Sequence, residues 1–386
     1  MGHYCHACGG TRPNEKFSGR GHAKHICRDC EIKARAARRA KLRESPPAAP
    51  PILKHTWGFK RYLRANAFGW SSSPLACKRL GEATKDVMGI AKHNPVLAGD
   101  GGVALCERIW PAFQSVDSST GALGTAVNKA TAEMVSLLIG APASDDVRRR
   151  WLDSLFKAAQ EDGVDYLCNL RESWGRLCGS PNLAGEWADH TLSVVQRTFS
   201  EREAFAYTSC DSICLSCLLE SGRYDDMRSL LDLARTRFWH SEKYWAEALK
   251  RQRQVDDALA YAESLLKESI NDGRFIVQFC EALLIEAEHE EEAYKRYALM
   301  LQTEPTYLNR YRAIKRRYPN RDPRGILLDL IGVDDEDEPG HWFAAAFRSG
   351  YADIALDCAQ QGVVDPKTSS GPRSRAETEI QHSRSL

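Results

Sequence analysis

The sequence lacks the features that mark membrane-spanning, secreted and many catalytic proteins. It has no run of about 18 apolar residues, the length a helix needs to cross a bilayer, and its N-terminus is polar and rich in cysteine where a signal peptide would be apolar. We therefore expect a cytoplasmic location and no membrane contact. It has no P-loop, no G-x-S-x-G or H-E-x-x-H motif and no acidic metal-binding set. We do not expect an enzyme.

Apolar side chains, by contrast, are plentiful. Of the 386 residues 43% are hydrophobic and nine are tryptophan, which is enough for a sizeable buried core. This length suggests two or three domains. The 13 cysteines are odd in number and spread over a large apolar chain, so we expect reduced thiols and no disulfide scaffold.

Charge is distributed unevenly although the formal net charge is only +1. Residues 1–45 contain eleven Lys and Arg against four acidic residues, whereas the remaining residues contain 42 basic and 48 acidic ones. The sequence therefore predicts a basic head, residues 1–45, attached to a mildly acidic body.

Four cysteines in the head have the spacing of a zinc site. Cys5 and Cys8 form one C-x2-C pair, and Cys27 and Cys30 form a second. A gap of two residues lets each pair of thiolates bind one face of a tetrahedral ion, with sulfur about 2.3 Å from the metal. Four cysteine ligands leave no position for an activated water, so we expect one structural Zn²⁺. The metal would supply the folding energy of a unit too small to fold alone.

The residues around the cysteines predict a knuckle, a hairpin, a second knuckle and a helix. Gly9 and Gly10 follow the first pair, where the chain turns tightly. Residues 16–27 have a Ser-Gly-Arg-Gly centre and predict a β-hairpin. The second pair opens a helix rich in Ala, Lys and Arg. This order is the layout of a treble-clef zinc finger.

These residues resemble the small zinc fingers of bacterial and phage proteins with the form C-x2-C-G-x3-P-x3-F-S followed by C-R-x-C. The matching residues are Cys5, Cys8, Gly9, Pro13, Phe17, Ser18, Cys27, Arg28 and Cys30. The resemblance implies the metal and the local fold over residues 5–30. It implies no single activity, because proteins with such fingers have many functions.

The helix after the second pair is a candidate nucleic-acid interface, with a solvated helix or a protein-docking arm as alternatives. Aromatic residues for base stacking are nearly absent from it, so contacts would be to phosphates and weakly sequence-selective. The candidate residues are Lys33, Arg35, Arg38, Arg39, Lys41 and Arg43. The histidines nearby are interpreted as surface residues, with substitute metal ligands or phosphate contacts as the alternatives; they are His3, His6, His22 and His25.

Beyond a proline-rich linker the sequence predicts helices and no strands. The prolines of residues 45–51 end the basic helix, because proline lacks the amide hydrogen. Apolar residues then recur at helical spacing, first in residues 57–63 and again in residues 123–137 and 147–156. Helix-start signals are present at residues 73–74, 117–119 and 144–146.

From about residue 205 the predicted helices repeat. Three segments, beginning SGRYDDM, RQVDDAL and EHEEEAY, align at separations of 31 and 35 residues, close to the 34 of tetratricopeptide repeats (TPRs). The alignment superimposes Met227, Ala258 and Ala293. Gly222 stands where such repeats have a turn glycine. Arg253 and Glu288 stand at the equivalent positions of the other two segments. The pattern predicts a TPR-like solenoid with a surface for a protein partner.

The helical part also resembles the C-terminal regions of uncharacterised bacterial proteins that carry SWIM-type zinc fingers. The resemblance extends loosely over residues 55–368 and is carried by VDSSTGALG at residues 116–124, RYPNRDP at 317–323 and HWFAAAFRSGYADIALDCA at 341–359. The SWIM pattern itself is absent. The resemblance implies an α-helical fold and no activity.

Three other patterns have simpler interpretations. Cys210, Cys214 and Cys217 have the spacing of an iron–sulfur site, but on a helix they form one apolar stripe. Residues 117–121 could present amides to an anion, but an N-cap and turn explain them. A second basic cluster is interpreted as a solvated face, with a phosphate-binding patch as the alternative; it comprises Arg310, Arg312, Lys315, Arg316, Arg317, Arg321 and Arg324.

Together these patterns predict an all-α protein, a TPR-like α-helical repeat with a small N-terminal treble-clef-like zinc finger. The predicted divisions are the finger at 1–45, a linker at 46–54, a helical bundle at 55–200, repeats at 201–365 and a disordered tail at 366–386. We expect a non-enzymatic adaptor whose repeats hold a protein and whose head contacts DNA or RNA. The alternatives are a protein-interaction scaffold with a purely structural zinc site, and an enzyme with an unrecognised site on the body.

Overall fold

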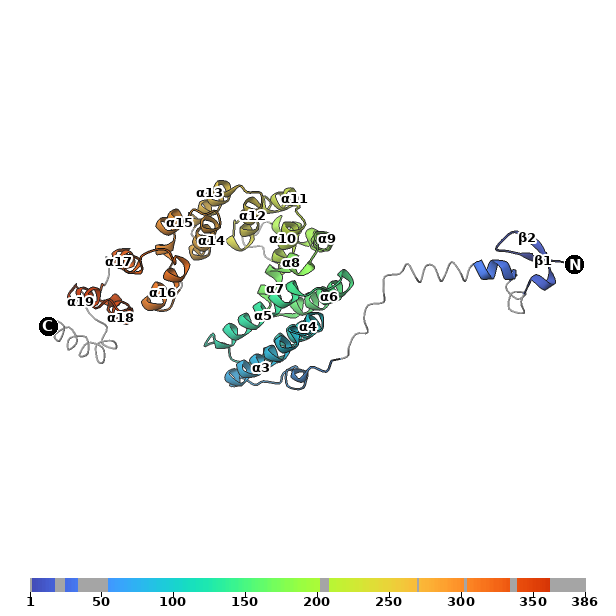
Figure 1. Ribbon diagram of the computed structural model, residues 1–386, viewed down its shortest axis with the longest axis horizontal. Helices are drawn as coiled ribbons and strands as arrows, with labels where there is room; N and C mark the ends of the chain where they lie inside the picture. Colours follow the sequence, from blue (N-terminus) through green and yellow to red (C-terminus); the bar gives the residue numbers. More distant parts are fainter. Residues whose placement is uncertain are drawn as a thin grey trace. The chain divides into compact units, whose positions relative to one another are not determined.

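The chain divides into two compact units, Met1–Thr56 and Trp57–Leu386, in a computed structural model. The structure describes residues 2–17, 25–33, 55–201, 208–268, 271–301, 304–333 and 339–361. Most of these residues are α-helical, as predicted, and a small hairpin lies at the N-terminus (Figure 1). The linker at 46–54 and the tail at 366–386 fall outside the described residues.

The N-terminal unit begins with a two-stranded antiparallel hairpin. Strand β1 (Gly2–Cys5) pairs with β2 (Gly10–Pro13), so that Cys5 lies opposite Gly10. A short 3-10 helix, η1 (Asn14–Lys16), follows, and residues 28–33 are α-helical. Cys5 is the last residue of β1, and Cys8 lies in the turn between the two strands. The hairpin predicted for residues 16–27 lies largely outside the described residues.

The body begins with five helices of 17 to 19 residues and three short ones, which pack around one apolar core. They are η2 (Gly58–Arg61), α3 (Ser73–Ala91), α4 (Pro95–Phe113), α5 (Ala122–Gly140), α6 (Asp145–Glu161), α7 (Cys168–Glu172), α8 (Trp174–Cys178) and α9 (Pro181–Phe199). Two glycines of α4 let tryptophan rings lie on its backbone. A Cβ added to Gly99 would lie 2.4 Å from the ring of Trp151, and one added to Gly101 would lie 2.3 Å from that of Trp57.

The body continues with shorter helices that follow one another as pairs (Figure 1). They are α10 (Asp211–Glu220), α11 (Tyr224–Leu231), α12 (Trp239–Arg251), α13 (Val255–Leu266), α14 (Gly273–Glu286), α15 (Glu290–Arg296), η3 (Ala298–Met300), α16 (Tyr307–Arg317), α17 (Pro323–Val333), η4 (Pro339–Trp342), α18 (Phe343–Arg348) and α19 (Ala352–Gln361).

Four of the turns within these pairs have the same backbone geometry. The turns after α10, α12, α14 and α18 each contain a residue with positive φ, namely Gly222 (73°), Arg253 (61°), Glu288 (63°) and Gly350 (89°). The amide of the next residue donates a hydrogen bond to the carbonyl five residues earlier, over 2.8–3.1 Å. This is the Schellman end of a helix. Gly222, Arg253 and Glu288, which the sequence alignment superimposes, therefore occupy one structural position.

The first helix of each pair contacts the first helix of the next. Helix α10 contacts α12, α12 contacts α14, and α16 contacts α18. Between α14 and α16, Glu281 accepts hydrogen bonds from the Tyr318 hydroxyl at 2.8 Å and from Arg317 Nε at 3.1 Å. Each pair also buries apolar residues of its second helix. Met227, Ala258 and Ala293 are all completely buried.

The apolar core of the body is divided into three clusters. The first extends from Trp57 to Ala248, past the predicted boundary at residue 200, because α10 and α11 pack on α9. The second covers residues 239–301 and the third residues 294–358. Within the described ranges, no helix combines the length and the apolar character that crossing a bilayer demands.

Candidate metal centre

The four cysteines of the two C-x2-C pairs come together in the N-terminal unit. The sulfur atoms of Cys5, Cys8, Cys27 and Cys30 all lie within 4.8 Å of one another. Cys5 and Cys27 are buried, Cys30 is half-buried and Cys8 is exposed. The spacing of the two pairs was therefore enough to identify a cluster that could hold one metal ion such as zinc.

Local backbone structure explains how each pair presents its sulfurs. Gly9, with a φ of 67°, lets the chain reverse after Cys8, and its amide donates to the Cys5 carbonyl at 2.9 Å. The second pair straddles a helix start, because residue 28 is the first helical residue and the Glu31 amide donates to the Cys27 carbonyl at 3.0 Å. Amides at a helix start favour thiolate over thiol.

The surroundings of the sulfurs favour negative charge on one ligand and disfavour it on another. The Cys27 amide donates to Cys5 Sγ at 3.2 Å and lowers the pKa of Cys5 to about 6. The neighbouring Cys27 thiol, by hydrogen bonding, raises the pKa of Cys30 to about 12. Arg12 on β2 hydrogen-bonds Cys8, which raises the pKa of the Arg12 guanidinium. Four thiolates this close need a cation among them.

The donor set fits zinc. A tetrahedral zinc ion holds sulfurs about 3.8 Å apart, which is compatible with four sulfurs within 4.8 Å. Thiolates are soft ligands that select zinc over the hard cations Mg²⁺ and Ca²⁺. His3, His6 and His25 are exposed, and none of them joins the cluster among the described residues. His22 lies outside the described residues.

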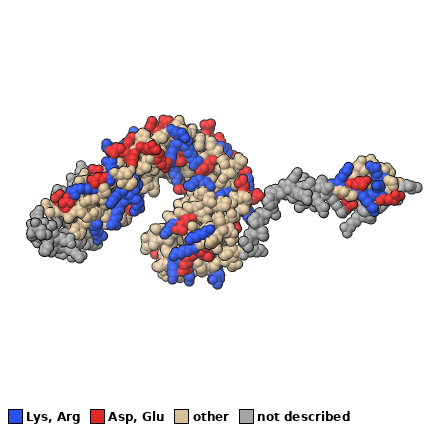
Figure 2. All heavy atoms as spheres, viewed as in Figure 1, with Lys and Arg blue, Asp and Glu red and all other residues tan. Residues whose placement is uncertain are grey.

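The predicted nucleic-acid interface falls mostly outside the described residues. Lys33 is exposed at the last described position of the basic helix, while Arg35, Arg38, Arg39, Lys41 and Arg43 lie beyond it. The described part of the head contains four basic and three acidic residues, and Figure 2 shows both signs of charge on its surface. Most of the positive excess of the head therefore comes from residues 18–24 and 34–45.

The second basic cluster separates into structural and exposed cations. Arg310 is buried and donates to the Leu299 carbonyl, Arg317 contacts Glu281, and Arg321 pairs with Glu291. Arg324 pairs with Asp353. The exposed members without an ion pair among the described residues are Arg312, Lys315 and Arg316. They share one face of α16, where Figure 2 shows a blue patch.

The other sequence candidates have structural explanations. Cys210, Cys214 and Cys217 are buried on or next to α10, and burial raises the pKa of Cys214 to about 12. No second group of three or more potential metal ligands occurs in the described part of the chain. In residues 117–121, the Asp117 carboxylate accepts from the Ser119 amide at 2.9 Å, and α5 starts only after Gly121. This segment is a turn.

Sequence reasoning missed two polar features near functional candidates. Arg12 contacts the cysteine cluster from β2, and its place on a strand beside the first pair was not recognised. Asp211 is 1% exposed and its Oδ1 has no hydrogen-bond partner. The signal available in the sequence was the position of Asp211 among the apolar and cysteine residues of CDSICLSC, which predicts a buried carboxylate.

Comparisons with family models, with curated proteins and with solved structures give no match for this chain.

Proposed function

We propose that this protein is a non-enzymatic zinc-binding adaptor. One structural zinc ion, held by Cys5, Cys8, Cys27 and Cys30, folds a treble-clef-like head, and the basic helix of the head contacts nucleic-acid phosphates. A TPR-like solenoid in the body holds a protein partner. The observation that carries the proposal is the convergence of the four sulfurs within 4.8 Å.

The metal supports a structural role because its four ligands are all cysteines. A closed thiolate sphere gives zinc no free position at which to activate water. It would hold the start of the helix whose predicted extension carries the basic residues, since Cys27 precedes the first turn of this helix and Cys30 lies within it. The zinc therefore orients a cationic helix, and cations near phosphates release counterions and bind in a salt-dependent way.

The body supports a binding role through its stacked helix pairs and an aromatic opening. The opening lies at the N-terminal ends of α12 and α14 and is lined by Phe238, Trp239, Phe275 and Phe279, together with Glu172 and Lys243. Phe275 is 57% exposed. A concave aromatic surface with a few charged groups at its edge is typical of protein-interaction sites.

The proposal is tested by charge reversal in the head. Arg35→Glu, Arg38→Glu and Arg39→Glu together should weaken binding to mixed-sequence DNA or RNA in a fluorescence titration. They should also flatten the salt dependence, by about 0.9 in log–log slope for each phosphate of duplex DNA that the variant no longer neutralises. The matched control reverses Arg312, Lys315 and Arg316 on α16 and should bind like the unmodified protein. Binding by the head variant that is as tight as that of the unmodified protein contradicts a role for the head. Weaker binding by the control variant alone would move the interface to α16.

A second candidate is a protein-interaction scaffold whose finger is another docking surface. The near balance of charge in the described part of the head favours it. It predicts no nucleic-acid binding at physiological salt by the unmodified protein in the same titration.

A further inference from the structure

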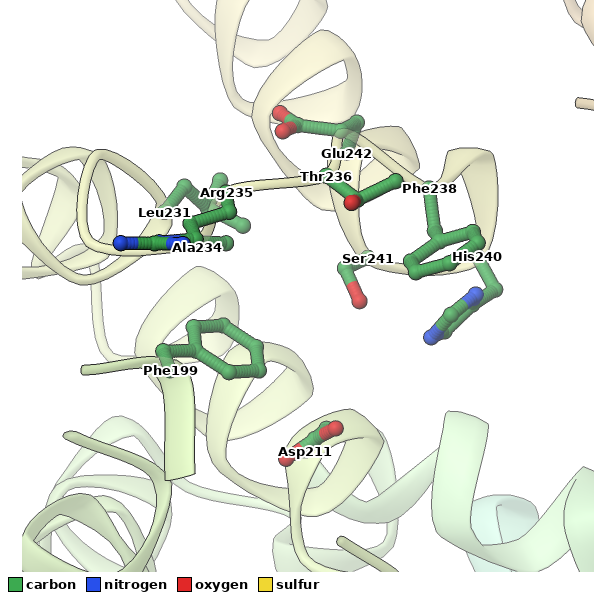
Figure 3. Close-up of a pocket in the computed structure, with 10 residues that line it drawn as sticks. All are labelled: Phe199, Asp211, Leu231, Ala234, Arg235, Thr236, Phe238, His240, Ser241 and Glu242. Carbon is green, nitrogen blue, oxygen red and sulfur yellow. The ribbon is translucent and has the colours of Figure 1, made fainter. Parts of the chain in front are cut away.

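A small opening lies in the body where α9 ends, α10 begins and the loop between α11 and α12 passes. Figure 3 shows its lining, which includes the apolar side chains Phe199, Leu231, Ala234 and Phe238. The polar lining comes from Asp211, from Arg235 and Thr236 in the loop, and from His240, Ser241 and Glu242 at the start of α12. The space has room for about one water-sized group. Residues 202–207, next to it in the sequence, lie outside the described residues.

Asp211 is the least satisfied group in this opening. Its Oδ2 accepts a hydrogen bond from the Thr208 amide at 3.2 Å, while its Oδ1 is buried without a partner. No Lys or Arg among the described residues forms an ion pair with it; Arg235 lines the same opening but directs its guanidinium away from Asp211 (Figure 3). A buried carboxylate without a cation is unfavourable, and burial raises the pKa of Asp211 to about 7.

The second acidic residue of the opening is already satisfied. Glu242 accepts a hydrogen bond from the Tyr261 hydroxyl and lies 3.7 Å from Arg237. In Figure 3 its carboxylate points away from Asp211, whereas the hydroxyl of Ser241 points toward the space in front of Asp211. The unmet acceptor and the nearby hydroxyl therefore belong to Asp211 and Ser241.

We propose that this opening binds a primary ammonium group, with the Asp211 carboxylate, which turns its buried Oδ1 toward the space, as the charged acceptor and the Ser241 hydroxyl as a second acceptor. An –NH₃⁺ head has three donors and is close to water in size, so it matches the space and neutralises the carboxylate. The apolar walls suit the methylene carbons attached to the nitrogen. A trimethylated ammonium is too large and has no N–H to donate. The same chemistry is offered by a free small amine and by a lysine side chain of a protein.

The test uses the full-length protein and two probes, methylammonium chloride and N-acetyl-lysine amide. Sodium chloride and tetramethylammonium chloride at equal ionic strength are the controls. Thermal unfolding and isothermal titration calorimetry should show that methylammonium raises the melting temperature above both salts. Asp211→Asn should weaken its binding about tenfold or more, because a charge-assisted hydrogen bond is removed. Asp256→Asn, at an exposed position in the first turn of α13, should bind like the unmodified protein.

The two probes identify the source of the ammonium group. Binding of methylammonium alone indicates a free amine, and equal or tighter binding of the lysine derivative indicates a side chain of a protein; either result supports the site. Equal melting temperatures in methylammonium, tetramethylammonium and sodium chloride overturn the proposal and leave the space to water. Binding that Asp211→Asn does not weaken overturns it as well. The comparison of the salts needs no variant, so it decides the matter even if Asp211→Asn does not fold.

Discussion

Buried charged side chains of the body are mostly satisfied by partners on or beside other helices. Arg148 donates hydrogen bonds to four backbone carbonyls. These bonds join α6 to the ends of α5 and α8. Glu281 accepts from two side chains at the end of α16. Asp211 differs because one of its oxygens has no partner. It is therefore the residue whose ionisation should affect stability most clearly.

The first prediction concerns this ionisation. The pKa of Asp211 is about 7 in the folded protein, against an ordinary value of 3.8, so the folded state binds the proton more tightly than the unfolded state. The stabilising effect is complete below about pH 4 and is lost as the pH rises through 7. A shift of this size corresponds to about 4 kcal/mol at most. In urea unfolding, the stability difference between Asp211→Asn and the unmodified protein should change by a few kcal/mol over this range. Parallel pH profiles would contradict the burial of an unpaired carboxylate.

Residue-level features differ in how far sequence could predict them. The cysteine cluster was predictable because both pairs are local and their spacing fits a tetrahedral ion. The state of Asp211 was not, because its surroundings come from α9, α10 and the loop before α12. The same holds for the separation of Arg310 and Arg317 from the exposed Arg312, Lys315 and Arg316, which depends on contacts across helix pairs.

At the scale of elements, the helix pairs of the second half share one turn. Its central residue has positive φ at Gly222, Arg253, Glu288 and Gly350. Glycine adopts this conformation without a steric cost, whereas an L side chain is strained by about 1–2 kcal/mol. Two of the four turns accept that strain, which shows that packing of the flanking helices determines the turn.

The second prediction tests this turn with two glycine-to-alanine changes. A Cβ at Gly222 or at Gly81 would meet no atom within 4 Å, so packing is not affected at either position. Gly222→Ala should destabilise the protein by about 1 kcal/mol because of its positive φ. Gly81→Ala, inside α3, should stabilise it by about 0.5–1 kcal/mol because alanine favours helix. Chemical denaturation measures both, and a destabilisation by Gly81→Ala or none by Gly222→Ala would refute the explanation.

Helix starts show where local signals suffice. Helices α3 and α6 begin at the predicted Ser73-Pro74 and Ser144-Asp145 signals. The signal at residues 117–119 was wrong by a few residues, because Asp117 caps a turn and α5 begins at Ala122. The predicted helix at residues 57–63 is a 3-10 turn, Gly58–Arg61, whose neighbours Trp57 and Leu63 are buried in the core. Periodicity located these apolar residues, but long-range packing set their backbone.

At the scale of the whole molecule, the two units have different origins of stability. The body buries three apolar clusters, whereas the small cluster of the N-terminal unit is formed by Cys5, Phe17 and Cys27. The three buried side chains of its described residues cannot offset the entropy of ordering a unit of this size, so we expect its fold to depend on metal. The body should be insensitive to that metal.

Metal content is the measurement that tests the account most directly. The protein and its Cys5→Ser, Cys27→Ser variant are dialysed against metal-free buffer and analysed for zinc by mass spectrometry, with thermal unfolding of the body as the control for folding. The account predicts one zinc per chain in the unmodified protein, none in the variant and the same melting of the body in both. Zinc retained at one per chain by the variant, or absent from the unmodified protein, would contradict it.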